Sequence, residues 1–140
     1  MILRILDTDH VSLLERKDTL VVDKFSRLAV GETAITIITW EEQVRGRLNV
    51  IRQATSSEQR ILAYSRLLAT IRFLQNFPII NFDAMADNYY LQLQPQKIRV
   101  GTQDLRIASI ALSCSAVVVT RNHRDFGKVP NLMLEDWTVA

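Results

Sequence analysis

The chain has 140 residues, of which 48% are hydrophobic and 23% are charged, and its formal net charge is +2. This length predicts a single domain over residues 1–140, and the composition excludes a disordered protein. No apolar run reaches the roughly 20 residues that span a bilayer, so we expect no membrane segment. The one cysteine, Cys114, excludes an internal disulfide and favours the reducing cytoplasm; we expect its thiol to be packed in the core.

Residues 2–6 form a short apolar run that predicts a first strand, followed by a turn at residues 7–9. Residues 34–39 are rich in β-branched side chains and predict a second strand. A helix is expected to open directly after it, with Thr39 as its N-cap and Glu42 at the third helical position, which is the pattern of a capping box.

The second half of the chain continues the alternation. A long helix is expected from Ser56 or Ser57 to about Gln75, with one apolar stripe formed by Ile61, Tyr64, Leu68 and Ile71. Further segments are predicted as strands at 77–81, 116–120 and 132–134, and as helices at 83–93 and 102–113, the helices capped by Asp83 and Thr102. Apolar strands alternating with helices predict an α/β fold with a mostly parallel sheet covered on both faces.

Acidic side chains fall where such a sheet binds ligands, beyond the carboxyl ends of its strands. Asp7 follows the first strand, Glu42 opens the helix after the second, and Asp125 follows the strand at 116–120. Asp104 shares a helix face with apolar Ile107, Ala108 and Ala111. Each has a structural explanation as well: an Asx-turn for Asp7, a capping box for Glu42 and the helix dipole for Asp104.

Taken together, these carboxylates predict a metal site. Two carboxylates about 4 Å apart repel by about 4 kcal/mol at an effective dielectric near 20, so a cluster of them needs a cation. Oxygen ligands select Mg²⁺ or Mn²⁺ rather than zinc. His10 and His123 stand without the Cys or His partners of a zinc site, and His123 is expected at the surface.

Five segments, in order and over essentially the whole chain, resemble the motifs of PIN domains and specifically of VapC-type toxins. Residues 6–10 (Leu-Asp-Thr-Asp-His) resemble the opening motif, and residues 38–46 the second, in a register that selects Glu42 over Glu41. Residues 82–89 resemble the mid-chain helix and 101–108 the third acidic motif. The fifth segment resembles the C-terminal signature and comprises residues 119–126, followed by 129–130 and 135–137.

This resemblance implies a PIN-like three-layer α/β/α sandwich, a homodimer, and an endoribonuclease that depends on Mg²⁺ or Mn²⁺. It implies an RNA substrate, transfer RNA in many relatives, and inhibition by a VapB-like antitoxin protein. The predicted catalytic and metal-binding residues are Asp7, Glu42, Asp104 and Asp125, supported by Thr8, Thr120 and Asn122. Arg45, Arg99, Arg106, Arg121 and Arg124 are candidates for phosphate contacts.

The sequence departs from the family at Asn122, where many PIN nucleases carry a fourth acid. Either Asp125 or Asn122 can supply the fourth ligand, and a degenerate PIN domain that binds RNA or protein without cutting is an alternative function. A haloacid-dehalogenase-type phosphohydrolase is a second alternative, because Asp7 and Asp9 fit its Asp-x-Asp opening. The downstream Lys and acidic motif of that class are missing, which favours the nuclease.

Overall fold

The computed structural model describes residues 2–140 and contains a five-stranded sheet in which every neighbouring pair is parallel. The sheet has the order β3-β2-β1-β4-β5. Its strands are β1 (Arg4–Leu6), β2 (Thr33–Thr36), β3 (Ile79–Ile80), β4 (Val117–Val119) and β5 (Met133–Glu135). The strand order changes direction between β1 and β4. A parallel α/β sheet binds its ligands at such a switch point, beyond the carboxyl ends of the strands.

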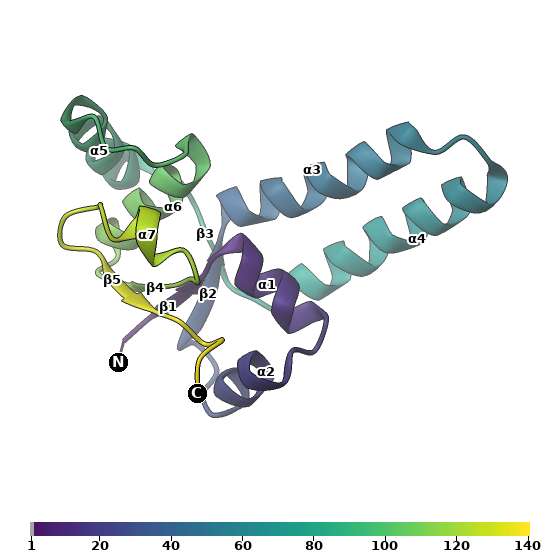
Figure 1. The fold of residues 1–140 in the computed structure, drawn as a ribbon, viewed down its shortest axis with the longest axis horizontal. Helices are drawn as coiled ribbons and strands as arrows, with labels where there is room; N and C mark the ends of the chain where they lie inside the picture. The colour runs from purple at the N-terminus through teal and green to yellow at the C-terminus, as the bar shows by residue number, and fades with distance from the viewer. Residues whose placement is uncertain (1) are drawn as a thin grey trace.

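Helices cover both faces of the sheet, which confirms the predicted three-layer α/β/α sandwich (Figure 1). Alternate residues of the strands enter two separate cores, because successive side chains of a strand point to opposite faces. Ile5 and Val118 pack with α5 (Ala84–Leu93) and α6 (Thr102–Ser113). Leu6 and Val119 pack on the opposite face with α1 (Thr8–Glu15), α2 (Thr19–Ser26) and the end of α4 (Ser57–Leu74). Between the last strands lies the short helix α7 (His123–Phe126), and η1 (Gln94–Gln96) follows α5.

Helices α3 (Ile37–Gln53) and α4 form a hairpin that extends away from the sheet (Figure 1). Arg47, in α3, links the two helices near the sheet, because its Nε donates to Thr70 Oγ1 of α4 at 2.9 Å. A terminal nitrogen of Arg47 also lies 3.5 Å from the Glu15 carboxylate and so connects the hairpin to α1. The apolar stripe predicted for α4 is not buried in this chain: Ile61 is 69% exposed and Tyr64 58% exposed. The hairpin leaves the sheet, so the outer part of α4 has no core to face.

Three predicted boundaries are wrong, and a side-chain cap of the following helix explains two of them. The second strand ends at Thr36 rather than at residue 39, because the Thr36 hydroxyl accepts from the Thr39 amide and begins α3 there. Thr39 is therefore not the N-cap. Residues 7–9 are not a simple turn but the start of α1, capped by Asp7. Gly101, not Thr102, occupies the N-cap position of α6.

Other expectations are confirmed, with one exception. Ser56 caps α4 and Asp83 caps α5, each accepting from a backbone amide of the first turn. Cys114 was expected in the core but is exposed, because it lies at the C-cap of α6 where the chain turns toward β4. Within residues 2–140, none of the helices combines the length and hydrophobicity that crossing a membrane requires.

Candidate active site

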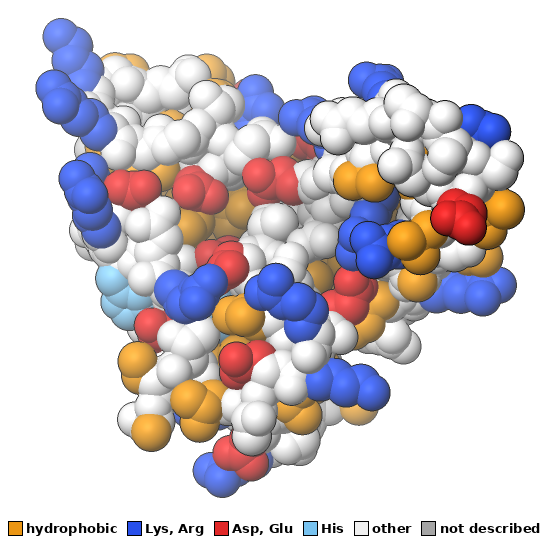
Figure 2. Space-filling view, turned by 45° about the vertical axis from the view of Figure 1, so that its right-hand side comes forward, with side chains coloured by type: hydrophobic (Ala, Val, Ile, Leu, Met, Phe, Trp, Pro, Cys, Tyr) orange, Lys and Arg blue, Asp and Glu red, His pale blue; other side chains and the backbone are white. Residues whose placement is uncertain are grey.

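An open cavity of about 580 Å³ lies beyond the carboxyl ends of β1 and β4. Its walls come from the loops and helix starts that follow these strands and from α3 and α6: Asp7, Thr8, Asp9, Ser12, Glu42, Asp104, Arg121, Asn122 and Phe126. Acidic side chains gather across the hollowed middle of this face, between the body and the α3–α4 hairpin (Figure 2). The cavity thus brings together carboxylates that lie as much as 97 residues apart in the sequence, Asp7 and Asp104.

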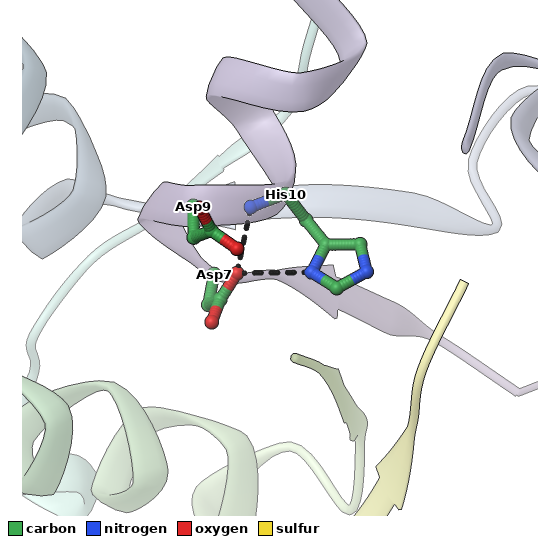
Figure 3. A group of neighbouring side chains, drawn as sticks. All are labelled: Asp7, Asp9 and His10. Atoms are coloured by element: carbon green, nitrogen blue, oxygen red, sulfur yellow. Dashed lines mark hydrogen bonds and ion pairs between the residues drawn. The ribbon is translucent and has the colours of Figure 1, made fainter. Parts of the chain in front are cut away.

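Asp7 is held by the helix that it caps. Its Oδ1 accepts from the backbone N–H of His10 at 2.8 Å and lies 3.2 Å from His10 Nδ1, as the dashed lines of Figure 3 show. Both contacts use one carboxylate oxygen. The second oxygen, Oδ2, has no hydrogen-bond partner among residues 2–140 and remains available to a ligand in the cavity.

Glu42 reaches the cavity from the second turn of α3, and Thr8 fixes its carboxylate. The Thr8 hydroxyl donates to Glu42 Oε1 at 2.6 Å, while Gln43 Nε2 donates to the Thr8 carbonyl at 3.1 Å and to Ser12 Oγ at 2.8 Å. Glu41, by contrast, lies outside the cavity, paired with Arg45 and accepting from Gln103. The helical register therefore separates two neighbouring carboxylates into different surroundings.

Asp104 is half-buried in the first turn of α6, and its helix face continues into buried Ile107, Ala108 and Ala111. Burial raises the pKa of this carboxyl from 3.8 to about 6, and the negative charges of Glu42, Asp7 and Asp125 add to the rise. The other three acidic residues predicted from the sequence therefore lie close enough to Asp104 for their charges to act on it. Among residues 2–140, no Lys or Arg pairs with Asp7, Glu42 or Asp104.

Asn122 and Asp125 lie at opposite ends of a single helical turn. Asn122 caps α7, with its Oδ1 accepting from the Asp125 amide at 3.3 Å and its Nδ2 donating to Asp125 Oδ2 at 3.0 Å. This hydrogen bond from Asn122, together with the charge of Lys128 nearby, lowers the pKa of Asp125 and keeps it ionised. The buried hydroxyl of Thr120 accepts from the Asn122 amide at 2.9 Å and so orders the same loop.

Asp7, Asp9 and His10 each bring one potential ligand atom to within 4.8 Å of the others, yet two of the three are already engaged. Arg121 forms two hydrogen bonds to the Asp9 carboxylate, at 2.7 and 2.9 Å, which neutralise its charge. Both ring nitrogens of His10 contact protein atoms, Nδ1 at Asp7 and Nε2 at the Trp137 amide. Asp7 and Glu42, by contrast, each keep one carboxylate oxygen without a hydrogen bond among residues 2–140, and both lie near Asp104. Asp9, the second acid of the Asp-x-Asp opening of haloacid-dehalogenase-type phosphohydrolases, is thus paired with Arg121 in this structure.

The donor atoms that converge on the cavity are carboxylate oxygens, a set that fits a hard divalent cation such as Mg²⁺ or Mn²⁺ and not zinc. Sequence reasoning missed Ser12 and Gln43, which border the cavity or order its walls, and it left His10 without a role. Their positions depend on how α1 packs against α3, and the sequence carries no local signal for that packing.

No family model matches the chain, but individual proteins do. The tRNA(fMet)-specific endonuclease VapC of Salmonella typhimurium is 32% identical over 118 residues, covering 73% of this chain and 89% of that protein. Ribonuclease VapC2 of Rickettsia felis is 39% identical over 69 residues, a match that spans 46% of this chain and 52% of the relative. The structure of DNA-bound VapBC from Salmonella typhimurium contains a chain of the same fold, with a TM-score of 0.79, 29% identity and coverage of 98% of this chain and 99% of that one. With this identity, this coverage and the shared architecture, the chain belongs to the VapC family of ribonucleases.

Proposed function

We propose that the protein is the toxin of a toxin–antitoxin pair, a single-domain endoribonuclease over residues 1–140 that uses Mg²⁺ or Mn²⁺. The observation that carries the metal dependence is the cluster around Asp104. The charges of Asp7, Glu42 and Asp125 act on Asp104, the pKa of Asp104 is raised to about 6, and no Lys or Arg among residues 2–140 forms an ion pair with Asp7, Glu42 or Asp104. Such a cluster is stable as a set of charged groups only around a cation.

Asp7, Glu42 and Asp104 would hold the metal, with Asp125 acting directly or through water. With Mg²⁺ or Mn²⁺ held there, the site would supply a coordinated water of lowered pKa and positive charge to offset that of the phosphodiester. Asp7 would bind through Oδ2, since Oδ1 is used by His10. Asn122 lines the cavity and Asp125 does not, but the Asn122 amide oxygen already caps α7 and carries no charge. We therefore assign the fourth position to Asp125, whose charge acts on Asp104 and which would reach the metal by exchanging its contacts with Asn122 and Lys128.

Supporting residues orient the carboxylates instead of binding the metal. Thr8 donates to one oxygen of Glu42 and leaves the other for the cavity. Thr120 and Asn122 fix the loop that carries Asp125. Of the five arginines considered for phosphate contacts, Arg121 lines the cavity, although its pair with Asp9 must open or be shared for it to reach a phosphate.

Transfer RNA is the substrate class to test first, because a relative of 32% identity is named a tRNA(fMet)-specific endonuclease. The proposed protein partner is a VapB-like antitoxin, since the solved structure of similar fold from Salmonella typhimurium is a VapBC complex. We also propose a homodimer, with exposed apolar residues of α4 such as Ile61 and Tyr64 as the first surface to examine. A nuclease of cellular RNA would act in the cytoplasm.

The test is cleavage of a total RNA pool by purified protein in Mg²⁺, in Mn²⁺ and in EDTA. Wild-type protein should cut only with metal, and Glu42→Gln should lose cutting by at least 100-fold. Glu41→Gln is the matched control, because it removes a carboxylate one residue away that lies outside the cavity. Equal activity of the two variants would contradict the proposed site. RNA binding without cleavage, by wild-type protein and in both metals, would favour a degenerate PIN domain.

A further inference from the structure

His10 is a polar side chain that is completely buried beside the candidate active site. It is 0% exposed and lies between the proposed metal ligand Asp7 and the C-terminal segment. Its backbone amide already donates to Asp7 Oδ1, so capping of α1 alone does not need the ring. A buried imidazole costs free energy unless both nitrogens are satisfied, and here both are.

The partners of the ring determine its tautomer. The backbone N–H of Trp137 lies 3.2 Å from His10 Nε2, and a backbone N–H can only donate. Nε2 must therefore offer its lone pair, which leaves the ring proton on Nδ1, 3.2 Å from Asp7 Oδ1. The Asp136 carboxylate lies 3.8 Å from Nε2, too far for a hydrogen bond, and its Oδ1 accepts from the Thr138 amide and hydroxyl instead.

Trp137 in turn is held firmly. It is 2% exposed, packs in the core on the α1 side of the sheet, meets the His10 ring edge-on at 6.4 Å, and donates from its indole to Glu135 at 3.1 Å. A continuous chain of contacts thus runs from the C-terminal segment after β5, through His10, to Asp7 Oδ1. Its last link leaves Asp7 Oδ2 as the oxygen that faces the cavity.

We propose that His10 is a positioning residue for the metal site: a neutral imidazole, protonated on Nδ1 and fixed by the Trp137 amide, that holds the Asp7 carboxylate in its metal-binding orientation. The inference rests on the proposed function, since it assumes that Asp7 is a ligand. Residues that orient a metal ligand by hydrogen bonding change metal affinity by about 10–100-fold when they are removed.

Two substitutions separate this role from simple core filling. In His10→Asn the amide nitrogen comes close to the place of Nδ1, so the bond to Asp7 is kept and the bond from Trp137 is lost. In His10→Gln the amide oxygen reaches the place of Nε2, so the Trp137 bond is kept and the Asp7 bond is lost. Both remove ring volume, and both should lower the melting temperature in EDTA.

The measurement is Mn²⁺ affinity of the purified full chain, from the signal of free Mn²⁺ in electron paramagnetic resonance, for wild type and both variants. His10→Gln should bind Mn²⁺ at least tenfold more weakly, and His10→Asn should keep the affinity of the wild type. Equal affinity of all three proteins would overturn the positioning role and leave the proposed metal site standing. Failure of the wild type itself to bind Mn²⁺ would contradict both.

A second readout needs no substitution of His10. The ¹⁵N spectrum of the wild-type histidine rings should show His10 protonated on Nδ1 and unprotonated on Nε2, before and after Mg²⁺ is added. His123→Gln assigns the signals, because the chain has only two histidines and His123 is exposed. A ring protonated on Nε2 would overturn the proposed chain of contacts even if neither His10 variant folds.

Discussion

Replacing Asp104 by Asn should make the metal-free protein more stable while abolishing its activity. A rise of the Asp104 pKa from 3.8 to about 6 corresponds to about 3 kcal/mol of unfavourable free energy for the charged form in the fold. The side chain is only half-buried, so solvent screening reduces this to about 1–2 kcal/mol. Attraction of the carboxylate to the N-terminus of α6 opposes it by up to about 0.5 kcal/mol. The expected net gain for Asp104→Asn is about 1 kcal/mol, or about 3 °C in melting temperature.

The gain should depend on pH in a defined direction. Well below pH 3.8, the pKa of the unfolded chain, the carboxyl is protonated in both the folded and the unfolded state, so wild type and variant should be alike. The difference between them should already be growing at pH 4. As the pH rises through the folded-state pKa of about 6, the wild type keeps a charge that the fold disfavours and loses stability relative to the variant. The assay is urea unfolding in EDTA at pH 4, 6 and 8. Asp87→Asn is the matched control, because Asp87 lies in the first turn of α5 and outside the cavity.

Divalent metal should reverse this order. A ligand that binds only the folded state stabilises that state, and the gain grows with the logarithm of the ratio of ligand concentration to Kd. Mn²⁺ should therefore raise the melting temperature of the wild type but not that of Asp104→Asn. The reasoning would be refuted by an Asp104→Asn protein that is less stable than wild type in EDTA at pH 8, which is the behaviour of a carboxylate that serves only the helix dipole.

Three further changes test the surroundings of the site. Gly46 borders a groove with Thr8 and Glu42, and a Cβ at Gly46 would meet nothing within 4 Å. Gly46→Leu should therefore keep the fold and the Mn²⁺ affinity but lower RNA cleavage at least tenfold. Unchanged cleavage would exclude this groove from the path of the RNA. Thr8→Val should lower the cleavage rate about tenfold, because it removes the hydroxyl that donates to Glu42. Thr8→Ser keeps this hydroxyl and should retain most of the activity. A Ser variant that cleaves as slowly as the Val variant would indicate lost packing instead. Arg47→Met leaves the buried Thr70 hydroxyl without its donor and should lower the free energy of unfolding in urea by about 1–2 kcal/mol. The control Arg45→Met removes only an exposed pair with Glu41 and should lower it by less than about 0.5 kcal/mol.

The sequence predicted the sheet and the acidic site because both depend on local pattern. The strand at 117–119 is a run of valines, and Asp104 stands out because it interrupts the apolar stripe of α6. The rule that ligands bind at the carboxyl ends of parallel strands then brings Asp7 and Glu42 to one edge without knowledge of the tertiary contacts. Asp104 lies on the helix that leads into β4, so its assignment to the site depends on its helix face and on the resemblance of residues 101–108 to the third acidic motif.

The errors occurred where one short motif supports two structures. Ile37, Ile38 and Thr39 have the β-branched side chains of a strand, but the Thr36 hydroxyl caps them into a helix. The Asp-Thr-Asp segment at 7–9 is typical of turns and equally of a helix start. The periodicity of apolar residues in α4 predicted a face packed against a core. The hairpin extends away from the sheet, so the residues of that face are exposed (Figure 1).

The role of His10 could not be predicted from local pattern at all. Its partner Trp137 lies 127 residues further along the chain, and the contact exists only because the segment after β5 returns beside α1. The same holds for the pairing of Asp9, which depends on Arg121, 112 residues away. Asp7, Asp9 and His10 are neighbours in the sequence, and each has a different set of partners in the fold.

The central claim, that Asp7, Glu42 and Asp104 form one metal site, is tested most directly by a crystal structure of the protein grown with Mn²⁺. The position of the ion is given by its anomalous scattering. The account predicts a peak bonded to Asp7 Oδ2, Glu42 and Asp104, with His10 Nδ1 still on Asp7 Oδ1 and Arg121 still near Asp9. A peak bonded to His10 or Asp9, or no peak in this cavity at saturating Mn²⁺, would contradict it.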